Sequence, residues 1–168
     1  ANTGDTISAT HDSTNNKIVI SYTNVGNSNY GTAIVGTVSG TSISFGTAVV
    51  FAAYTMYGSS LIFDSNSNKI VITFQDGSNS QRGTAIVGTV SSTSISFGAA
   101  SVFNSGTTYH NAATYDSTNN KVVIAYVDQG NSKYGTAIVG TVSGTSISFG
   151  AETVFESVST DDMAITYD

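Results

Sequence analysis

A sixteen-residue block, GTAIVGTVSGTSISFG, occurs three times in this chain, at residues 31–46, 83–98 and 135–150. The copies begin 52 residues apart and differ only where Gly40 is replaced by Ser92. A fixed period of this length is typical of repeated supersecondary units, which bury their apolar faces against one another because none can do so alone. The sequence therefore predicts one repeat domain.

The same period divides the whole chain, residues 1–168, into equivalent parts. The predicted parts are, in order, an additional inner-strand copy at 1–12 and three units at 13–64, 65–116 and 117–168. Because 1–12 corresponds to 157–168, this segment is present four times and the rest of the repeat three times. Unpaired strands invite pairing, so we expect the surplus copy to lie against a neighbouring subunit.

The composition excludes several classes of function. The net charge is −6 with only five Lys and Arg residues, which disfavours nucleic acid because phosphate neutralisation needs clusters of basic side chains. Cysteine is absent, so neither disulfides nor thiolate metal sites can form. No apolar run is long enough to predict membrane insertion. We expect no cofactor.

Each unit is predicted to consist of short strands, because β-branched and aromatic residues dominate and no stretch has a helical period. We expect a strand at 7–11 in the additional copy and strands at 17–22, 32–38 and 42–45 in the first unit, the last continuing toward 49–51. Each unit ends with its own copy of the 7–11 strand, at 60–63, 112–115 and 164–167. The sequence therefore predicts an all-β fold with four strands in each 52-residue unit.

Tight turns and one longer connection join these strands. Residues 12–16 read DSTNN, a sequence in which the Asp side chain accepts hydrogen bonds from the following backbone. The connection 52–60 is expected to carry the chain from the outer strand of one unit to the inner strand of the next. The predicted core consists of Ile18, Ile20, Ile34, Val38, Ile43, Phe45 and their copies 52 and 104 residues later.

Four strands joined as hairpins, with small residues such as Ala9, Ala112 and Ala164 in the inner strand, resemble a β-propeller blade. The repeats are similar to tandem blade-like arrays in virion and cell-surface proteins of marine microbes and phages. This resemblance implies a propeller-like array of three blades with a surplus terminal strand, in an extracellular, cell-surface or virion protein. A β-trefoil or β-prism is the alternative, since either accommodates three four-stranded repeats.

The segment 114–120 (TYDSTNN) resembles the Asp-box turn of sialidase-type blades, but it lacks the glycine and tryptophan of that motif. No catalytic residue is therefore implied, and we expect no enzymatic activity. Three blades cannot close a ring, since propellers have four to eight. We expect the chain to self-associate, as a homodimer with six blades or as a head-to-tail polymer.

Comparison of the three units shows where they differ. The connections at 52–58, 104–110 and 156–162 share almost no residues, and the turns at 24–30, 76–82 and 128–134 also vary. In an up-and-down blade these segments emerge at one face, and loops on a rigid scaffold commonly carry binding residues. The same variation also arises in loops under relaxed selection. The candidate ligand-binding residues are Tyr54, Tyr57, Tyr109, His110, Asn27, Asn79, Asn131, Asp76 and Asp128.

Other motifs fail on particular residues. The Gly31–Gly36 spacing is that of a phosphate loop, but Thr37 stands where lysine is required. The segment 64–75 matches an EF-hand only in its first half, because Lys69 replaces the required glycine. His11 shares its repeat position with aromatic residues, and no cluster with metal-ligand spacing is present, so we expect no metal site.

Two functional hypotheses remain from the sequence. The first is a non-enzymatic, lectin-like binding module that uses the variable face of an oligomeric propeller to bind a glycan, because sugars need aromatic faces and convergent polar groups. The alternative is a purely structural repeat element of a fibre, a phage tail or a surface layer. A low content of charged residues and Thr/Ser/Asn-rich strands suit such an assembly.

Overall fold

In a computed structural model of the chain, the described residues are 7–167, and their regular structure is almost entirely strand. The strands of the first half are β1 (Ile7–Asp12), β2 (Lys17–Asn24), β3 (Tyr30–Ser39), β4 (Ser42–Phe45), β5 (Val49–Asp64), β6 (Lys69–Asp76) and β7 (Arg82–Ser91). Those of the second half are β8 (Ser94–Phe97), β9 (Ser101–Asp116), β10 (Lys121–Asp128), β11 (Tyr134–Ser143), β12 (Ser146–Phe149) and β13 (Thr153–Ser159). Two 3-10 turns, η1 (Val25–Asn27) and η2 (Gln129–Asn131), complete the assignment. Among these residues no helix is long and apolar enough to cross a bilayer.

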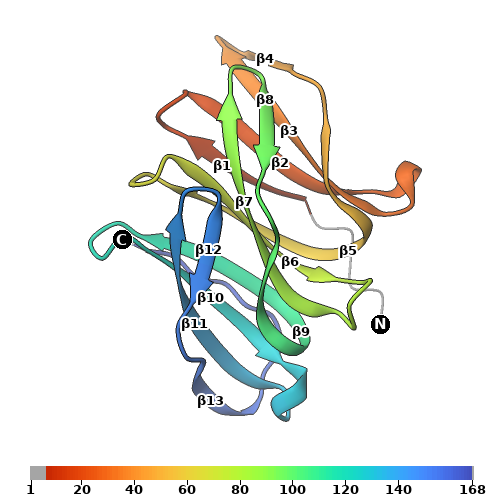
Figure 1. Cartoon of the computed structure of the whole chain (residues 1–168), viewed down its shortest axis with the longest axis vertical. Helices are drawn as coiled ribbons and strands as arrows, with labels where there is room; N and C mark the ends of the chain where they lie inside the picture. Colours follow the sequence, from red (N-terminus) through yellow and green to blue (C-terminus); the bar gives the residue numbers. More distant parts are fainter. Residues whose placement is uncertain (1–6, 168) are drawn as a thin grey trace.

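Hydrogen bonds join all 13 strands into one antiparallel sheet, which does not close on itself. The all-β prediction is confirmed. The sheet folds into three layers because β5 and β9 each belong to two of them. Residues 49–55 of β5 pair with β3, whereas residues 56–64 pair with β6. Strand β9 connects β7 to β10 in the same way. Figure 1 shows the three layers one above the other, with β1, β2 and β3 in the upper layer.

The predicted connection at 52–60 is part of the continuous strand β5, so the prediction of a loop there was wrong. The strand changes direction through a bulge between Tyr57 and Ser59, where Gly58 has φ +43°. A glycine adopts this left-handed conformation without a steric penalty. The equivalent His110 in β9 has φ +49°, so the bulge, rather than a loop, carries the chain between layers.

The Asx-type turns predicted after the inner strands are present. In the second copy, Asp64 Oδ1 accepts hydrogen bonds from the backbone N–H groups of Asn66, at 2.9 Å, and Ser67, at 3.1 Å. The Ser67 hydroxyl donates to Asp64 Oδ2 at 2.7 Å. These bonds hold Asp64 almost fully buried, at 3% exposure, and close each inner hairpin in the same geometry.

Two apolar clusters hold the three layers together. The first lies between the first and second layers and includes Val35 and Phe51 on one side and Ile72 and Phe74 on the other. The second repeats this arrangement between the second and third layers. The middle-layer strands β6 and β7 are therefore buried on both faces, which accounts for the runs of buried residues along them.

The predicted core is buried or half-buried in the second and third copies, but in the first copy three of its six residues are only half-buried and the prediction was wrong for the other three. Val38, Ile43 and Phe45 are 53%, 44% and 48% exposed. The equivalent Val90 and Ile95 are 7% and 3% exposed, because the first layer covers them. Within the described chain no layer covers the outer face of the first layer, so identical side chains there remain in solvent.

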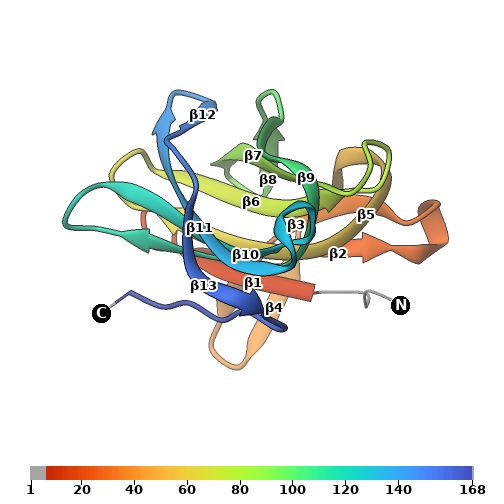
Figure 2. The ribbon, with the colours of Figure 1, turned by 90° about the horizontal axis from the view of Figure 1, so that it is seen from below.

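The last described segment, residues 160–167, has no assigned strand. It is attached to the third layer by a hydrogen bond from the Thr160 N–H to the Lys133 carbonyl, at 2.9 Å. The hydroxyl groups of Thr118 and Tyr167 also form a hydrogen bond. Figure 2 shows this segment leaving β13, and it shows the hairpins β3–β4, β7–β8 and β11–β12 projecting from the layers.

Candidate functional site

The variable segments lie together along one edge of the layered sheet. At the end of β6, Asp76 pairs with Met56 of β5 and with Arg82 of β7. Arg82 in turn pairs with Thr107 of β9. The Thr108 N–H donates to the Gln81 carbonyl at 3.0 Å, which joins the two kinds of variable segment directly. The predicted common edge is therefore present in the structure.

Aspartate side chains shape the turns at this edge. Asp76 Oδ1 accepts from the backbone N–H of Ser78 at 2.9 Å and from its hydroxyl at 2.6 Å. Asp128 Oδ1 accepts from the Gly130 N–H at 2.9 Å and caps η2. Both aspartates are more than nine-tenths buried. Such side chains commonly satisfy the free N–H groups of a turn, so the carboxylates need no metal ion to account for their positions.

At the junction of the first and second layers, Tyr54 occupies the space above Asp76. The ring is half-buried and packs against the first apolar cluster. Burial, reinforced by the nearby carboxylate of Asp76, raises the pKa of Tyr54 from 10.0 to about 12. The structure thus brings together two of the predicted ligand-binding residues, with the aromatic ring filling the junction.

The equivalent place between the second and third layers is a pocket of about 280 Å³. Its lining residues come from β9, the end of β10, η2 and the β12–β13 connection, and they are Asn104, Ser105, Gly106, Asp128, Gly130, Asn131 and Glu152. A Cβ at Gly106 would lie 3.2 Å from Asn104 Oδ1 and 3.5 Å from Asp128 Oδ1. A side chain at position 106 would therefore enter the pocket, as Tyr54 does at the first junction.

The pocket has one buried hydrogen-bond donor without a partner. Asn104 is 4% exposed, and its Oδ1 accepts from the Gly106 N–H at 2.6 Å. Its Nδ2 has no hydrogen-bond partner among the described residues. A buried donor left unpaired costs about 1–3 kcal/mol. Because this atom is itself fully buried, a ligand in the pocket reaches it only if the Asn104 side chain turns toward the pocket. Asp128 and Glu152 add acceptor oxygens to the same pocket.

These carboxylates also act on the tyrosine beside them. Burial raises the pKa of Tyr126 well above its ordinary value, and the charges of Glu152 and then Asp128 raise it further. The phenol of Tyr126 is therefore neutral at any physiological pH. Its hydroxyl group is fully buried, and Tyr126 does not line the pocket.

The other predicted aromatic residues lie elsewhere on the edge. Tyr57 pairs with Gln75 in β6, and Tyr109 pairs with Val127 in β10. Both side chains are half-buried. The Tyr109 ring lies edge-on to the His110 ring, with centroids 6.3 Å apart.

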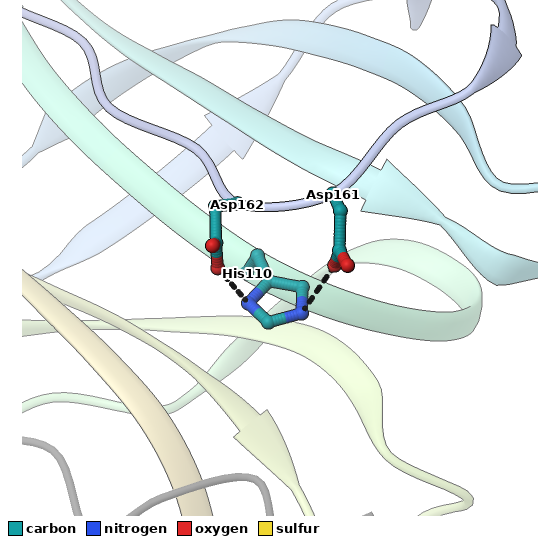
Figure 3. A group of neighbouring side chains, drawn as sticks. All are labelled: His110, Asp161 and Asp162. Carbon is teal, nitrogen blue, oxygen red and sulfur yellow. Dashed lines mark ion pairs between the residues drawn. The ribbon is translucent and has the colours of Figure 1, made fainter.

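Two aspartates of the last segment hold His110 (Figure 3). His110 Nε2 lies 3.1 Å from an Asp161 carboxylate oxygen, and Nδ1 lies 3.2 Å from one of Asp162. The three residues form the one candidate metal-ligating group in the described part of the chain, and all are exposed. Because the carboxylates flank opposite ring nitrogens, a single ion bound to one nitrogen would leave the other carboxylate unused. The group instead fastens the last segment to β9.

The asparagines are divided among the three turns. Asn27 in η1 and Asn131 in η2 are exposed, whereas Asn79 is half-buried and its carbonyl accepts from the Arg82 N–H at 3.1 Å. Of the nine predicted residues, Asp128 and Asn131 line the pocket. The nine side chains are spread along the edge, with Tyr54 and Asp76 at the first junction and His110 beside the last segment.

Asn104, Gly106 and Glu152 were not among the predicted site residues. The signal that identifies them is a direct comparison of equivalent positions, where the first junction has Ala52, Tyr54 and Ala100. At these three positions the first junction thus has different side chains from those that line the pocket.

The chain was compared with protein-family models, curated proteins and solved structures, and no match was found in any of the three.

Proposed function

We propose that the chain is a non-enzymatic, glycan-binding module whose binding site is the pocket between its second and third layers. The observation that carries this proposal is the pocket itself, whose lining brings the amide of Asn104 together with the carboxylates of Asp128 and Glu152. A sugar hydroxyl group both accepts and donates hydrogen bonds. It can accept from Asn104 while donating to Asp128 or Glu152.

Size and position support a small polar ligand. Ligand pockets commonly measure roughly 300–1,000 Å³, and 280 Å³ lies just below that range. The pocket therefore suits one terminal sugar unit rather than a long oligosaccharide. It also lies on the edge where the units differ most in sequence, which is where a repeat scaffold can vary its specificity.

The proposal includes the architecture in which this site is placed. We regard the three layers as blades of an incomplete β-propeller, because each layer has the strand order and pairing of the next and the chain passes from outer to inner strand through β5 and β9. A β-trefoil or β-prism accounts less well for these shared long strands. An adhesive protein at a cell or virion surface is the setting that fits this module.

The proposal is tested with an array of glycans and then by calorimetric titration of any glycan retained. The decisive variant is N104A/G106Y/E152A, which gives the second junction the residues of the first. It should lose binding and keep its melting temperature within a few degrees, because each new residue already occurs at the equivalent position in this chain.

The reciprocal variant A52N/Y54G/A100E is the matched control. It should create a second pocket and raise the stoichiometry from one glycan to two per chain. A wild-type chain that retains no glycan, or an N104A/G106Y/E152A variant that binds as tightly as the wild type, would overturn the proposed site.

A structural repeat element is the second candidate function. It is favoured by a separate observation, the apolar side chains left exposed at the two outer layers. An assembly built through those faces is compatible with a glycan site on the edge, because the two surfaces are different.

A further inference from the structure

Two exposed apolar faces lie at opposite ends of the stack of layers. The leading face belongs to the first layer and is formed by the half-buried Ile20, Tyr22 and Ile34 and by the exposed Val38, Ile43 and Phe45. The trailing face belongs to the third layer and is formed by the half-buried Val123 and Ala137 and by the exposed Val139 and Phe155. On these faces both layers keep the apolar residues that are buried in the other copies.

The two faces are the halves of an interface that the chain already forms twice. Phe51 contacts Phe74 and Phe97 of the next layer, with ring centroids 5.5 and 5.4 Å apart. One repeat later, Phe103 contacts Tyr126 and Phe149, at 5.2 and 5.9 Å.

Among the described residues, no layer covers the third copy of this aromatic position. Phe155 is 55% exposed, whereas Phe103 is 4% exposed. The residues that correspond to Tyr126 and Phe149 one layer further along are Tyr22 and Phe45, which lie on the leading face. A second copy of the chain would therefore bring the missing aromatic partners.

Backbone contacts repeat in the same way. A Cβ at Gly46 would overlap the Thr93 carbonyl oxygen of the second layer, and one at Gly98 would overlap that of Thr145 in the third. Both glycines are required by close approach of the next layer. At Gly150, the nearest atom to a Cβ is the Val139 carbonyl oxygen of its own layer, at 3.8 Å. Gly150 thus keeps the residue type needed for a contact that no other described residue supplies.

We propose that the trailing face of one copy of this chain binds the leading face of a second copy, in the geometry of the two internal interfaces. The contact is head-to-tail, so it places Phe155 against Tyr22 and Phe45 of the second copy and Gly150 against Thr41. Burial of the apolar side chains stabilises it, as it stabilises the internal junctions. Head-to-tail contacts of this kind form a ring where the rotation closes and a filament where it does not.

The position of segment 160–167 affects which strand pairs with the second copy. It lies next to β9, and its Asp162 has φ +50°, close to the bulge conformation of His110 and Gly58. It therefore occupies the position that the inner strand of a following layer would take. Residues 163–168 (MAITYD) and 7–12 (ISATHD) share repeat positions, so either segment can pair with β2 of the second copy. The contact of the two faces is the same in both cases.

The experiment uses two variants of the full chain, each with one face blocked. Ile43→Asp places a charge on the leading face and Val139→Asp places one on the trailing face, at side chains that are 44% and 45% exposed. Each monomer should fold, as checked by circular dichroism and cooperative melting. Val25→Asp is the matched control, since Val25 is 64% exposed in η1 and belongs to neither face.

Mass is measured by light scattering after size exclusion at about 100 μM. The wild type and Val25→Asp should form a dimer or a larger species of the 17.3 kDa chain. Each blocked variant alone should be a monomer, and an equimolar mixture of the two should form a one-to-one dimer through the remaining pair of faces.

Three results would overturn the proposal. The first is a wild-type chain that is monomeric at this concentration. The second is a folded, blocked variant that still dimerises by itself. The third is an equimolar mixture that stays monomeric, which would show that any wild-type assembly joins other surfaces. The glycan site is untouched by either substitution, so binding measured on the same variants separates the two proposals.

Discussion

Replacing Phe103 and Phe155 in turn by alanine measures how much a covering layer adds to the stabilisation that one side chain provides. The quantity compared is the free energy of unfolding. The two phenylalanines occupy equivalent positions and follow Val102 and Val154, but they are 4% and 55% exposed. Phe103 also contacts two rings of the third layer, Tyr126 and Phe149. Any difference between the two substitutions therefore reports on the layer that covers only Phe103.

The expected magnitudes follow from burial. Removing a buried phenylalanine side chain costs about 3–5 kcal/mol. Burying the side chain completely is worth about 1.5–3 kcal/mol, and Phe155 loses less than half of its exposure, so Phe155→Ala should cost about 1 kcal/mol. The free energy of unfolding should thus differ between the variants by at least about 2 kcal/mol.

Urea unfolding followed by circular dichroism at about 1 μM protein measures both values in the dilute chain. The dependence of the free energy on urea concentration should be the same in both variants, because a change would indicate that the layers unfold separately. Equal destabilisation by the two substitutions at this dilution would refute the reasoning, since it would mean that Phe155 is covered within a single chain.

Three further predictions concern equivalent or adjacent groups. Asp64→Ala should lower the free energy of unfolding by about 1–2 kcal/mol, because it removes the buried hydrogen-bond acceptor of the turn. Asp116→Ala, at the more exposed copy of this turn, should lower it by less in the same urea assay. Gly98→Ala should destabilise the chain by about 1–3 kcal/mol through overlap with the next layer, and Gly150→Ala should leave the melting temperature of the dilute chain unchanged. Tyr54 is favoured in its neutral form, with a pKa of about 12 against 10.0, so its contribution to stability is full below pH 10 and is lost between about pH 10 and 12. Tyr54→Phe should make the alkaline fall in melting temperature shallower, and an unchanged fall would contradict the assignment.

Local features of the fold could be predicted because they depend on a few adjacent residues. The turn after each inner strand follows from the Asp carboxylate and the N–H groups beside it. The assignment of His11 to an aromatic position is also confirmed: His11 Nε2 lies 3.3 Å from Asn16 Oδ1, and the Tyr115 hydroxyl donates to Asn120 Oδ1 at 3.0 Å. The same contact with an asparagine side chain is thus made by an imidazole in one copy and by a phenol in another.

Exposure could not be predicted in the same way. Ile43, Ile95 and Ile147 stand in sequence surroundings that differ only at Ser92, yet they are 44%, 3% and 5% exposed. Their burial depends on whether another layer packs against them, and no local pattern encodes this. The bulged strand β5 was missed for a related reason, since Gly58 and its polar neighbours have the composition of a loop while pairing with β6 holds them extended.

The candidate pocket could be predicted only in part. Its position on the variable edge follows from the order of the strands, but its existence depends on Gly106 in place of Tyr54 and on Asn104 in place of Ala52. A comparison of the units identifies these differences. Only the packing of β9 against η2 shows that they lie around one space.

The single difference within the repeated block yields the last prediction. Gly40 and Gly144 have φ values of +60° and +61°, and Ser92 at the same turn has +57°. A non-glycine residue in this region costs about 1–2 kcal/mol, while glycine loses about 0.5–1 kcal/mol more in conformational entropy on folding. A Cβ at Gly40 or Gly144 would meet nothing within 4 Å, so a side chain at this turn gains no packing that offsets the strain. Ser92→Gly should therefore stabilise the chain by about 0.5–1 kcal/mol in urea unfolding, and Gly144→Ser should destabilise it by a similar amount. If Ser92→Gly instead lowered stability, the serine would have to make a stabilising contact at this turn.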